Sequence, residues 1–152
     1  MRTSPKPGRR RIVAAAALVG LTLGLATPPA LAATASSPLG YIGPIAGKNY
    51  SNQAVVSDQS VNYNLYAATR NNSRSGNLPT GYLGARPRLY KGTSLCSQGA
   101  WYYNTGTASG ISTSRHTNGC GRGSYNSYGV TRHYNGNGYD SYYTFRSPSI
   151  RY

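Results

Sequence analysis

The chain has 152 residues, with 16 lysines and arginines against only 2 acidic residues, so its formal net charge is +14. The acids, Asp58 and Asp140, and the histidines, His116 and His133, are too few for a metal cage or for an active site rich in carboxylates. We therefore expect no catalytic residue, no metal and no cofactor.

Residues 1–32 predict a signal peptide. They begin with a cluster of basic residues, continue with an apolar stretch over residues 12–26, and end in Ala30-Leu31-Ala32, which fits the small-residue pattern before a signal peptidase cleavage site. The remaining residues 33–152 suit a single domain. No second apolar stretch among them is long enough to cross a bilayer. We expect a secreted protein without a membrane span.

Residues 33–52 predict an extended arm rich in proline and glycine. They carry no charged side chain before Lys48, and the recurring prolines and glycines exclude a helix. Its apolar side chains are the candidates for partner binding: Leu39, Tyr41, Ile42, Pro44 and Ile45. Two arrangements fit this segment. It could be an edge strand or loop packed on its own domain, or an arm that a partner receives beside its own sheet or in a cleft.

Residues 53–152 predict a β domain rich in Tyr, Asn and Gly. Aliphatic residues are scarce, but the chain has 15 tyrosines, and each ring can bury apolar area while its hydroxyl finds a polar partner. Alternation predicts strands at 61–68, 81–90, 100–104, 111–117, 124–134 and 139–146, and a polar loop at 69–80. In the first of these strands Val61, Tyr63, Leu65 and Ala67 would share one face. Pro87 places part of the second on an edge or a bulge.

Turn signals complete the predicted fold. Asn135-Gly136-Asn137-Gly138 is typical of a tight hairpin, and residues 105–110 predict a turn that pairs 100–104 with 111–117. No segment after the signal has helical periodicity. We therefore expect an all-β fold, a small sandwich or partly open barrel of roughly six to eight short strands with an extended N-terminal arm.

Cys96 and Cys120 are the only cysteines. In an exported protein an isolated pair predicts one disulfide, which would tie the base of the 100–117 hairpin. In the chain-entropy account this bond is worth about 3 kcal/mol. A redox role is disfavoured because the C-x-x-C spacing is absent.

The cations and aromatic residues predict a binding surface. Most cations are scattered, and only Arg86, Arg88 and Lys91 cluster. Basic residues among tyrosines can bind single-stranded nucleic acid, but export and this scatter argue against it. Two alternatives stay open: a solvated face that keeps a Tyr-rich surface soluble, and attraction to an acidic partner or to anionic cell-wall polymers. Trp101, Tyr102 and Tyr103 are the candidates for stacking on a sugar or a protein. The alternative for Trp101 is core packing under the disulfide, which we favour.

A family resemblance rests on four features: a signal ending PPALA, the arm, the single Cys pair, and the hairpin sequence YNSYGVTRHYNGNGYDSYYTFRSPS. These resemble small secreted proteins of filamentous soil bacteria, among them the adaptor subunit of secreted umbrella toxin particles. The resemblance implies that the chain joins a lectin-like subunit to a large toxin-bearing subunit, with its arm residues in a partner cleft. The chain is also similar to small Tyr/Gly-rich bacteriocins of the lactococcin type.

These observations predict a secreted, non-enzymatic adaptor that binds other proteins in an antibacterial assembly. Two alternatives stay open. One is a carbohydrate or cell-wall binding module that uses Trp101, Tyr102 and Tyr103. The other is a stand-alone bacteriocin. We expect no nucleic-acid partner.

Overall fold

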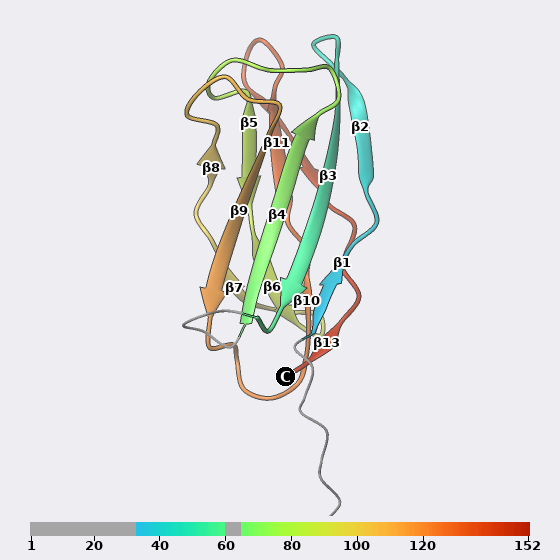
Figure 1. The fold of residues 1–152 in the computed structure, drawn as a ribbon, viewed down its shortest axis with the longest axis vertical. Coiled ribbons are helices and arrows are strands. Elements are labelled where there is room, and N and C mark those ends of the chain that lie inside the picture. The colour runs from blue at the N-terminus through green and yellow to red at the C-terminus, as the bar shows by residue number, and fades with distance from the viewer. Residues whose placement is uncertain (1–32, 60–64) are drawn as a thin grey trace, which may run out of the picture. The chain divides into compact units, whose positions relative to one another are not determined.

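The computed structural model describes residues 33–59 and 65–152 (Figure 1). The regular elements of these residues are all strands in antiparallel pairing, which confirms the predicted all-β fold. The strands form two stacked layers that do not close into a barrel. The described residues contain thirteen strands, more than predicted, because two expected strands are each divided into two short ones and five strands form where none was expected.

The first layer is a five-stranded sheet. Its order is β1-β3-β4-β9, and β2 pairs with β3 on the same side as β1. The strands are β1 (Thr34–Ser36), β2 (Gly40–Ile45), β3 (Lys48–Ser57), β4 (Leu65–Ser73) and β9 (Gly110–Thr117). The two open edges of this layer are therefore β1 with β2 on one side and β9 on the other.

The second layer consists of two four-stranded sheets, ordered β12-β11-β5-β8 and β13-β10-β6-β7. The first contains β5 (Leu83–Arg86), β8 (Tyr102–Tyr103), β11 (Val130–Tyr134) and β12 (Tyr139–Tyr143); the second contains β6 (Arg88–Lys91), β7 (Ser94–Gln98), β10 (Ser124–Ser127) and β13 (Ile150–Arg151). The chain crosses between them at Pro87 and again at Gly129, and this is why the predicted strands 81–90 and 124–134 are divided. A Cβ at Gly129 would come within 1.9 Å of Thr69 Oγ1, so the second crossing needs glycine.

Residues 33–52 form β1, β2 and the start of β3, so the predicted arm segment is packed on its own domain. β1 and β2 both pair with β3, which runs through the predicted boundary after residue 52. Ala46 and Gly47 have φ values of 45° and 72°, and two successive positive values make the tight turn that joins β2 to β3. Ile45 and Tyr50, on either side of this turn, are buried in the core. Detaching the segment would expose them, so of the two arrangements the structure has the packed one.

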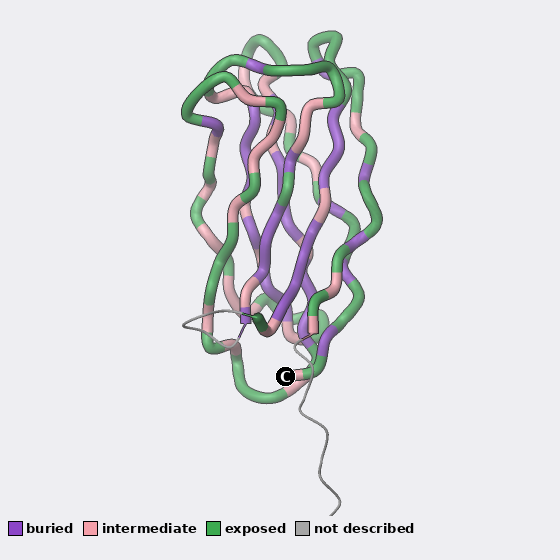
Figure 2. Tube along the Cα trace, in the orientation of Figure 1, coloured by how far each residue is buried: buried purple, intermediate pink, exposed green. Residues whose placement is uncertain are grey.

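The core consists of two apolar clusters between the layers, and Figure 2 shows that the buried residues lie along the strands. The larger contains Val56, Leu65, Ala67, Leu89, Tyr125 and Ile150, and the smaller contains Ile45, Tyr50, Leu78 and Leu83. Leu65 and Ala67 share a buried face as predicted. Their predicted companions Val61 and Tyr63 lie outside the described residues.

Buried polar side chains lie beside these clusters, and they explain why part of the prediction for residues 69–80 is wrong. The predicted loop at 69–80 is wrong at its start, because β4 continues to Ser73. Asn71 is buried, and its Nδ2 donates to the carbonyl oxygens of Gly84 at 2.9 Å and Arg132 at 3.2 Å. Its Oδ1 lies 2.8 Å from His133 Nε2. A polar residue can occupy a buried strand position when the opposite layer satisfies its amide.

The predicted hairpin at Asn135-Gly136-Asn137-Gly138 is confirmed, with Tyr134 paired to Tyr139 across β11 and β12. The other predicted hairpin is wrong, because β8 pairs with β5 and β9 pairs with β4. The disulfide Cys96–Cys120 is confirmed. It joins β7 of the second layer to the loop after β9 of the first, so it links the two layers and not the base of a hairpin.

Candidate binding surfaces

The two open sides of the sandwich carry most of its exposed large apolar side chains. On one side the edge strand β2 lies beside the edge strand β12; on the other, β8 lies beside β9 (Figure 1). The exposed side chains on or next to these strands are Leu39, Tyr41, Tyr102, Tyr139, Tyr143 and Phe145. Exposed aromatic residues gathered at one place are typical of recognition surfaces.

The larger opening is a groove of about 400 Å³ between β2 and β12, here called the β2–β12 groove. Tyr41, Tyr143 and Phe145 line it, and each leaves more than half of its surface exposed, at 66%, 56% and 57%. Ile42 and Tyr142 contribute half-buried apolar surface to the same groove. Its walls thus come from both layers.

Asn52 of β3 lies beneath this groove and holds its two walls together. Its Nδ2 donates to Thr131 Oγ1 at 3.1 Å and to the carbonyl oxygen of Tyr143 at 3.3 Å. Its Oδ1 is buried and has no hydrogen-bond donor among the described residues. A Cβ at Gly40, the β2 residue paired with Asn52, would come within 2.4 Å of that oxygen. Glycine at position 40 is therefore what leaves space above the free acceptor.

Beside the groove, three tyrosines and two arginines form what we call the Arg–Tyr ladder: Tyr90, Tyr128, Tyr143, Arg88 and Arg146. The rings of Tyr128 and Tyr143 stack with centroids 5.0 Å apart. The Arg146 guanidinium lies 4.8 Å from the centroids of Tyr90 and Tyr128, and that of Arg88 lies 5.4 Å from Tyr90 and 5.9 Å from Tyr143. A tyrosine ring attracts a guanidinium that lies over its face, and the guanidinium keeps N–H donors that can bind an anion.

The ladder's positive charge meets no carboxylate. Asp58 accepts from the backbone N–H of Ala33, and Asp140 accepts from Asn135 Nδ2 at the hairpin turn. Arg146 donates to Asn126 Oδ1, a neutral acceptor, at 2.7 Å. The buried Nε of Arg88 has no acceptor within the described ranges. Two positioned guanidiniums therefore lie beside the groove without a counter-charge.

The predicted arm residues divide between groove and core. Leu39, Tyr41 and Pro44 are exposed, and Arg74 lies 4.7 Å above the ring of Tyr41. Ile45 is buried and Ile42 packs against the same apolar cluster. Ile45 is therefore withdrawn from any partner, whereas Tyr41 and the half-buried Ile42 line the groove.

On the opposite side, Trp101 is half-buried under two guanidiniums, those of Arg132 at 4.1 Å and Arg86 at 5.9 Å. It joins neither apolar cluster, so the favoured prediction of core packing is wrong. Tyr103 accepts from Arg132 at 3.0 Å and is half-buried, while Tyr102 is exposed.

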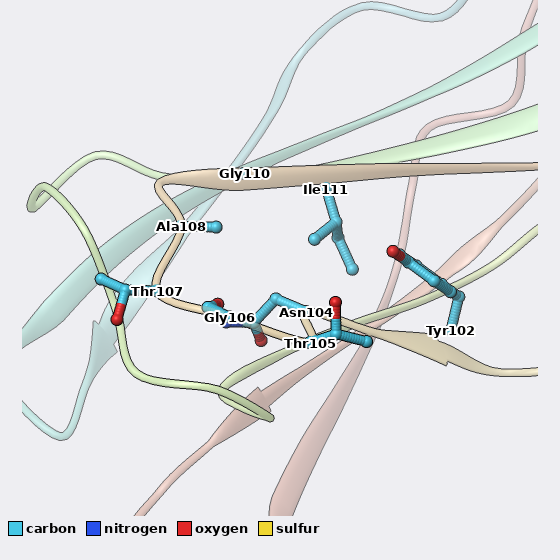
Figure 3. A pocket seen from close by; sticks show the side chains of 8 residues that line it. All are labelled: Tyr102, Asn104, Thr105, Gly106, Thr107, Ala108, Gly110 and Ile111. Carbon is cyan, nitrogen blue, oxygen red and sulfur yellow. The ribbon is translucent and has the colours of Figure 1, made fainter.

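Tyr102 borders a hollow of about 230 Å³, the β8–β9 hollow, with Ile111 of β9 facing it (Figure 3). Asn104 sits at its base, where its amide donates to Pro79 and Gly106 and accepts from Leu83 N–H. Because that amide is fully used, the groups left for a ligand are the Tyr102 ring and the hydroxyls of Thr105 and Thr107.

The predicted basic cluster does not form one patch. Arg86 donates to the carbonyl oxygen of Gly99, Arg88 belongs to the Arg–Tyr ladder, and Lys91 donates to the carbonyl oxygen of Cys120. Sequence reasoning also missed Asn52, Tyr128 and Arg146. Only their positions relative to β2 and β12, which the sequence does not give, mark them as groove residues.

The histidines occupy different environments. His116 lies on the edge strand β9, with its Nε2 3.1 Å from Ser114 Oγ. His133 is buried with its ring 4.0 Å from that of Tyr50. Burial lowers the pKa of His133 to about 4, although the charge of Asp140 acts in the opposite direction. Within 33–59 and 65–152, no three His, Cys, Asp or Glu side chains are grouped so as to hold a metal ion.

In the described part of the chain no helix has the length and apolar character needed to cross a membrane. Comparison with protein families, with curated proteins and with solved structures finds no match to the chain. Its function must therefore be inferred from its own residues.

Proposed function

We propose that this protein is a secreted, non-enzymatic adaptor that links subunits of an extracellular antibacterial toxin assembly. One observation carries the proposal: two exposed aromatic surfaces lie on opposite open sides of one disulfide-linked sandwich. These are the β2–β12 groove and the β8–β9 hollow.

An adaptor needs two surfaces that are independent and held at a fixed separation. In each layer several paired strands separate the groove from the hollow. Within the described ranges the sheet edges at both sides are unpaired, and such edges bind other chains readily. Tyrosines at both sides supply rigid contact area at a low cost in conformational entropy.

The titratable groups support a binding role over catalysis. His133 is buried and paired with Asn71, so its ring is not presented to a substrate. Asp58 and Asp140 hold a backbone amide and a turn, in contacts that stabilise local structure. The disulfide fits an oxidising compartment, which agrees with export.

The proposal is tested by affinity capture from culture supernatant with the tagged full-length chain, followed by mass spectrometry. We expect large secreted proteins in fixed ratio. The double variant Tyr41→Ser/Tyr143→Ser should lose one of them, and Tyr102→Ser should lose another. Leu95→Ser, at an exposed apolar residue on β7 away from both surfaces, is the matched control. Recovery of no protein, or of the same proteins by all variants, would refute the adaptor.

A carbohydrate-binding role is the second candidate, and the exposed Tyr102 ring beside the β8–β9 hollow favours it. Binding to a glycan array that is lost in Tyr102→Ala and kept in Tyr143→Ala would support it. A stand-alone bacteriocin predicts a different result: the pure protein by itself would inhibit the growth of related bacteria.

A further inference from the structure

We propose that the β2–β12 groove receives an extended acidic segment of a partner protein, added as a strand along the open edge of β12. The inference rests on the proposed protein-binding function and specifies the chemistry of one partner. Three observations support it: the direction of the backbone groups of β12, the shape of the groove, and the charge beside the groove.

The backbone hydrogen bonds between β11 and β12 show which N–H and C=O groups of β12 point to its unpaired edge. Asn135 N–H donates to Gly138, and Thr144 N–H donates to Gly129. Alternate residues make such bonds in an antiparallel pair, so Asp140 and Tyr142 face β11. Ser141 and Tyr143 therefore direct their N–H groups to the open edge. The carbonyl oxygen of Tyr143 is already held by Asn52, which leaves that of Ser141 as an acceptor.

β2 forms the opposite wall of the groove and is a poor template for an added strand. Its pairing with β3 shifts register between Ile42 and Ile45. Pro44, within that stretch, has no N–H to donate. An incoming strand would therefore pair with β12 and only pack its side chains against β2.

The groove can hold the inward side chains of such a strand. Alternate residues of an added strand point to opposite faces, so every second side chain would enter the 400 Å³ between Ile42 and Tyr142. Asn52 Oδ1, buried and without a donor, could pair with a small polar side chain there. These inward positions should therefore be apolar or small.

The outward side chains of the strand would lie beside the Arg–Tyr ladder. Arg88 and Arg146 lie over tyrosine rings and have no carboxylate partner. A carboxylate at alternate positions of the strand would supply one through charge-assisted hydrogen bonds. Asp140 is the one acid on β12, and it lies near the turn, so the acidic positions should face the Tyr143 end.

A glycan is the less favoured occupant of this groove, because stacking on a sugar needs a free ring face and most of the tyrosine rings here are already covered. Tyr128 and Tyr143 cover each other, Arg146 covers Tyr128 and Tyr90, and Arg74 lies over Tyr41. What the groove offers a ligand is positive charge and unpaired backbone N–H and C=O groups.

The test selects peptides from a random dodecapeptide display library on the immobilised full-length chain, then measures the affinities of enriched peptides by calorimetry. We expect acidic residues at alternate positions, no central proline, and affinity that falls as salt rises. Ser141→Pro should weaken binding at least about tenfold, since it removes an open N–H. Ser112→Pro is the matched control: Ser73 N–H donates to Ser109, which places Ser112 N–H on the open edge of β9.

A second pair of variants tests the charge. Arg146→Gln should weaken binding and reduce its salt dependence, while Arg122→Gln, exposed in the loop before β10, removes the same charge elsewhere and should do neither. Circular dichroism confirms that each variant folds.

Several results would overturn strand addition: no acidic enrichment, equal loss in Ser141→Pro and Ser112→Pro, or selective binding of a neutral oligosaccharide in the groove. A supernatant partner that is kept by Ser141→Pro but lost by Tyr41→Ser/Tyr143→Ser would refute this inference and leave the adaptor proposal intact. Peptide binding as expected, without any supernatant partner, would refute the adaptor instead.

Discussion

Acid should destabilise this protein as the pH falls from 6.5 toward 4, and His133 is the reason. The ring is buried beside Tyr50, and its Nε2 is paired with Asn71. Its Nδ1 is buried without a hydrogen-bond partner in the described residues. A proton added to this ring would place a charge in the core, and burial therefore lowers the pKa of His133 from 6.5 to about 4.

The sign and size of the effect follow from linkage. The unfolded chain takes up a proton on His133 near pH 6.5, whereas the folded chain resists it until about pH 4. Stability from this residue is therefore fully present above pH 6.5 and is lost as the pH falls toward 4. At 1.36 kcal/mol for each unit of the pKa difference, the full loss is about 3 kcal/mol, most of it reached by pH 4.5.

Urea unfolding at pH 7.5, 6.0 and 4.5 measures this loss. His133→Gln should start less stable, because it disturbs the pairing with Asn71, but its stability should change little over the same range. His116→Gln, at an exposed site on β9, should keep the wild-type pH dependence. A wild-type free energy of unfolding that stays constant between pH 7.5 and 4.5 would show that His133 is not buried as a neutral ring.

Three further changes have defined outcomes. Cys96→Ser/Cys120→Ser should lower the free energy of unfolding by about 3 kcal/mol, measured by urea titration, since it releases the link between the layers. Gly129→Ala should cost about 1 to 3 kcal/mol or more in the same assay, because its Cβ would meet Thr69, whereas Gly106→Ala, with open space around it, should be neutral. Gly40→Ala should lower the melting temperature and weaken binding in the β2–β12 groove, since the new methyl group would displace Asn52.

The alternating pattern predicted the strands well where a strand has one apolar face. Leu65 and Ala67 are buried together, and the Asn-Gly turn forms the hairpin of β11 and β12. The disulfide followed from the cysteine count and the predicted export alone. These features are local in the sequence, or need only one pairing between two residues.

The errors arose where tertiary contacts override local signals. Ala46 is an unusual residue for a positive φ, so the turn that makes β2 and β3 a hairpin had no sequence signature beyond Gly47. Thr69 and Asn71 are polar and were assigned to a loop, but the second layer supplies their partners. The prediction that β8 pairs with β9 relied on the tendency of strands that follow each other in the chain to pair. It failed because here the two strands belong to different layers.

The sequence indicates which kinds of residue form the binding surfaces, but not which of them lie together in space. Tyr41 and Tyr102 are exposed, as a surface role requires. The Arg–Tyr ladder could not be found from the sequence, because it draws residues from β6, from the crossing before Gly129 and from the segment after β12. Its members are brought together by pairing of β10 with β6 and of β11 with β12, which no local pattern specifies.

The same shortage of aliphatic residues shapes both the core and the surfaces. Buried positions between the layers are filled by Asn52, Thr69, Asn71 and Thr131, whose side chains bond across the sandwich. Such bonds depend on geometry, so they fix the separation of the layers more sharply than aliphatic contacts would. Asn52 shows the consequence: by donating to Tyr143 and Thr131 it holds β12 at a set distance from β3 and β2, and its unused oxygen remains beneath the groove. The polar core thus maintains the opening in which we place the partner strand.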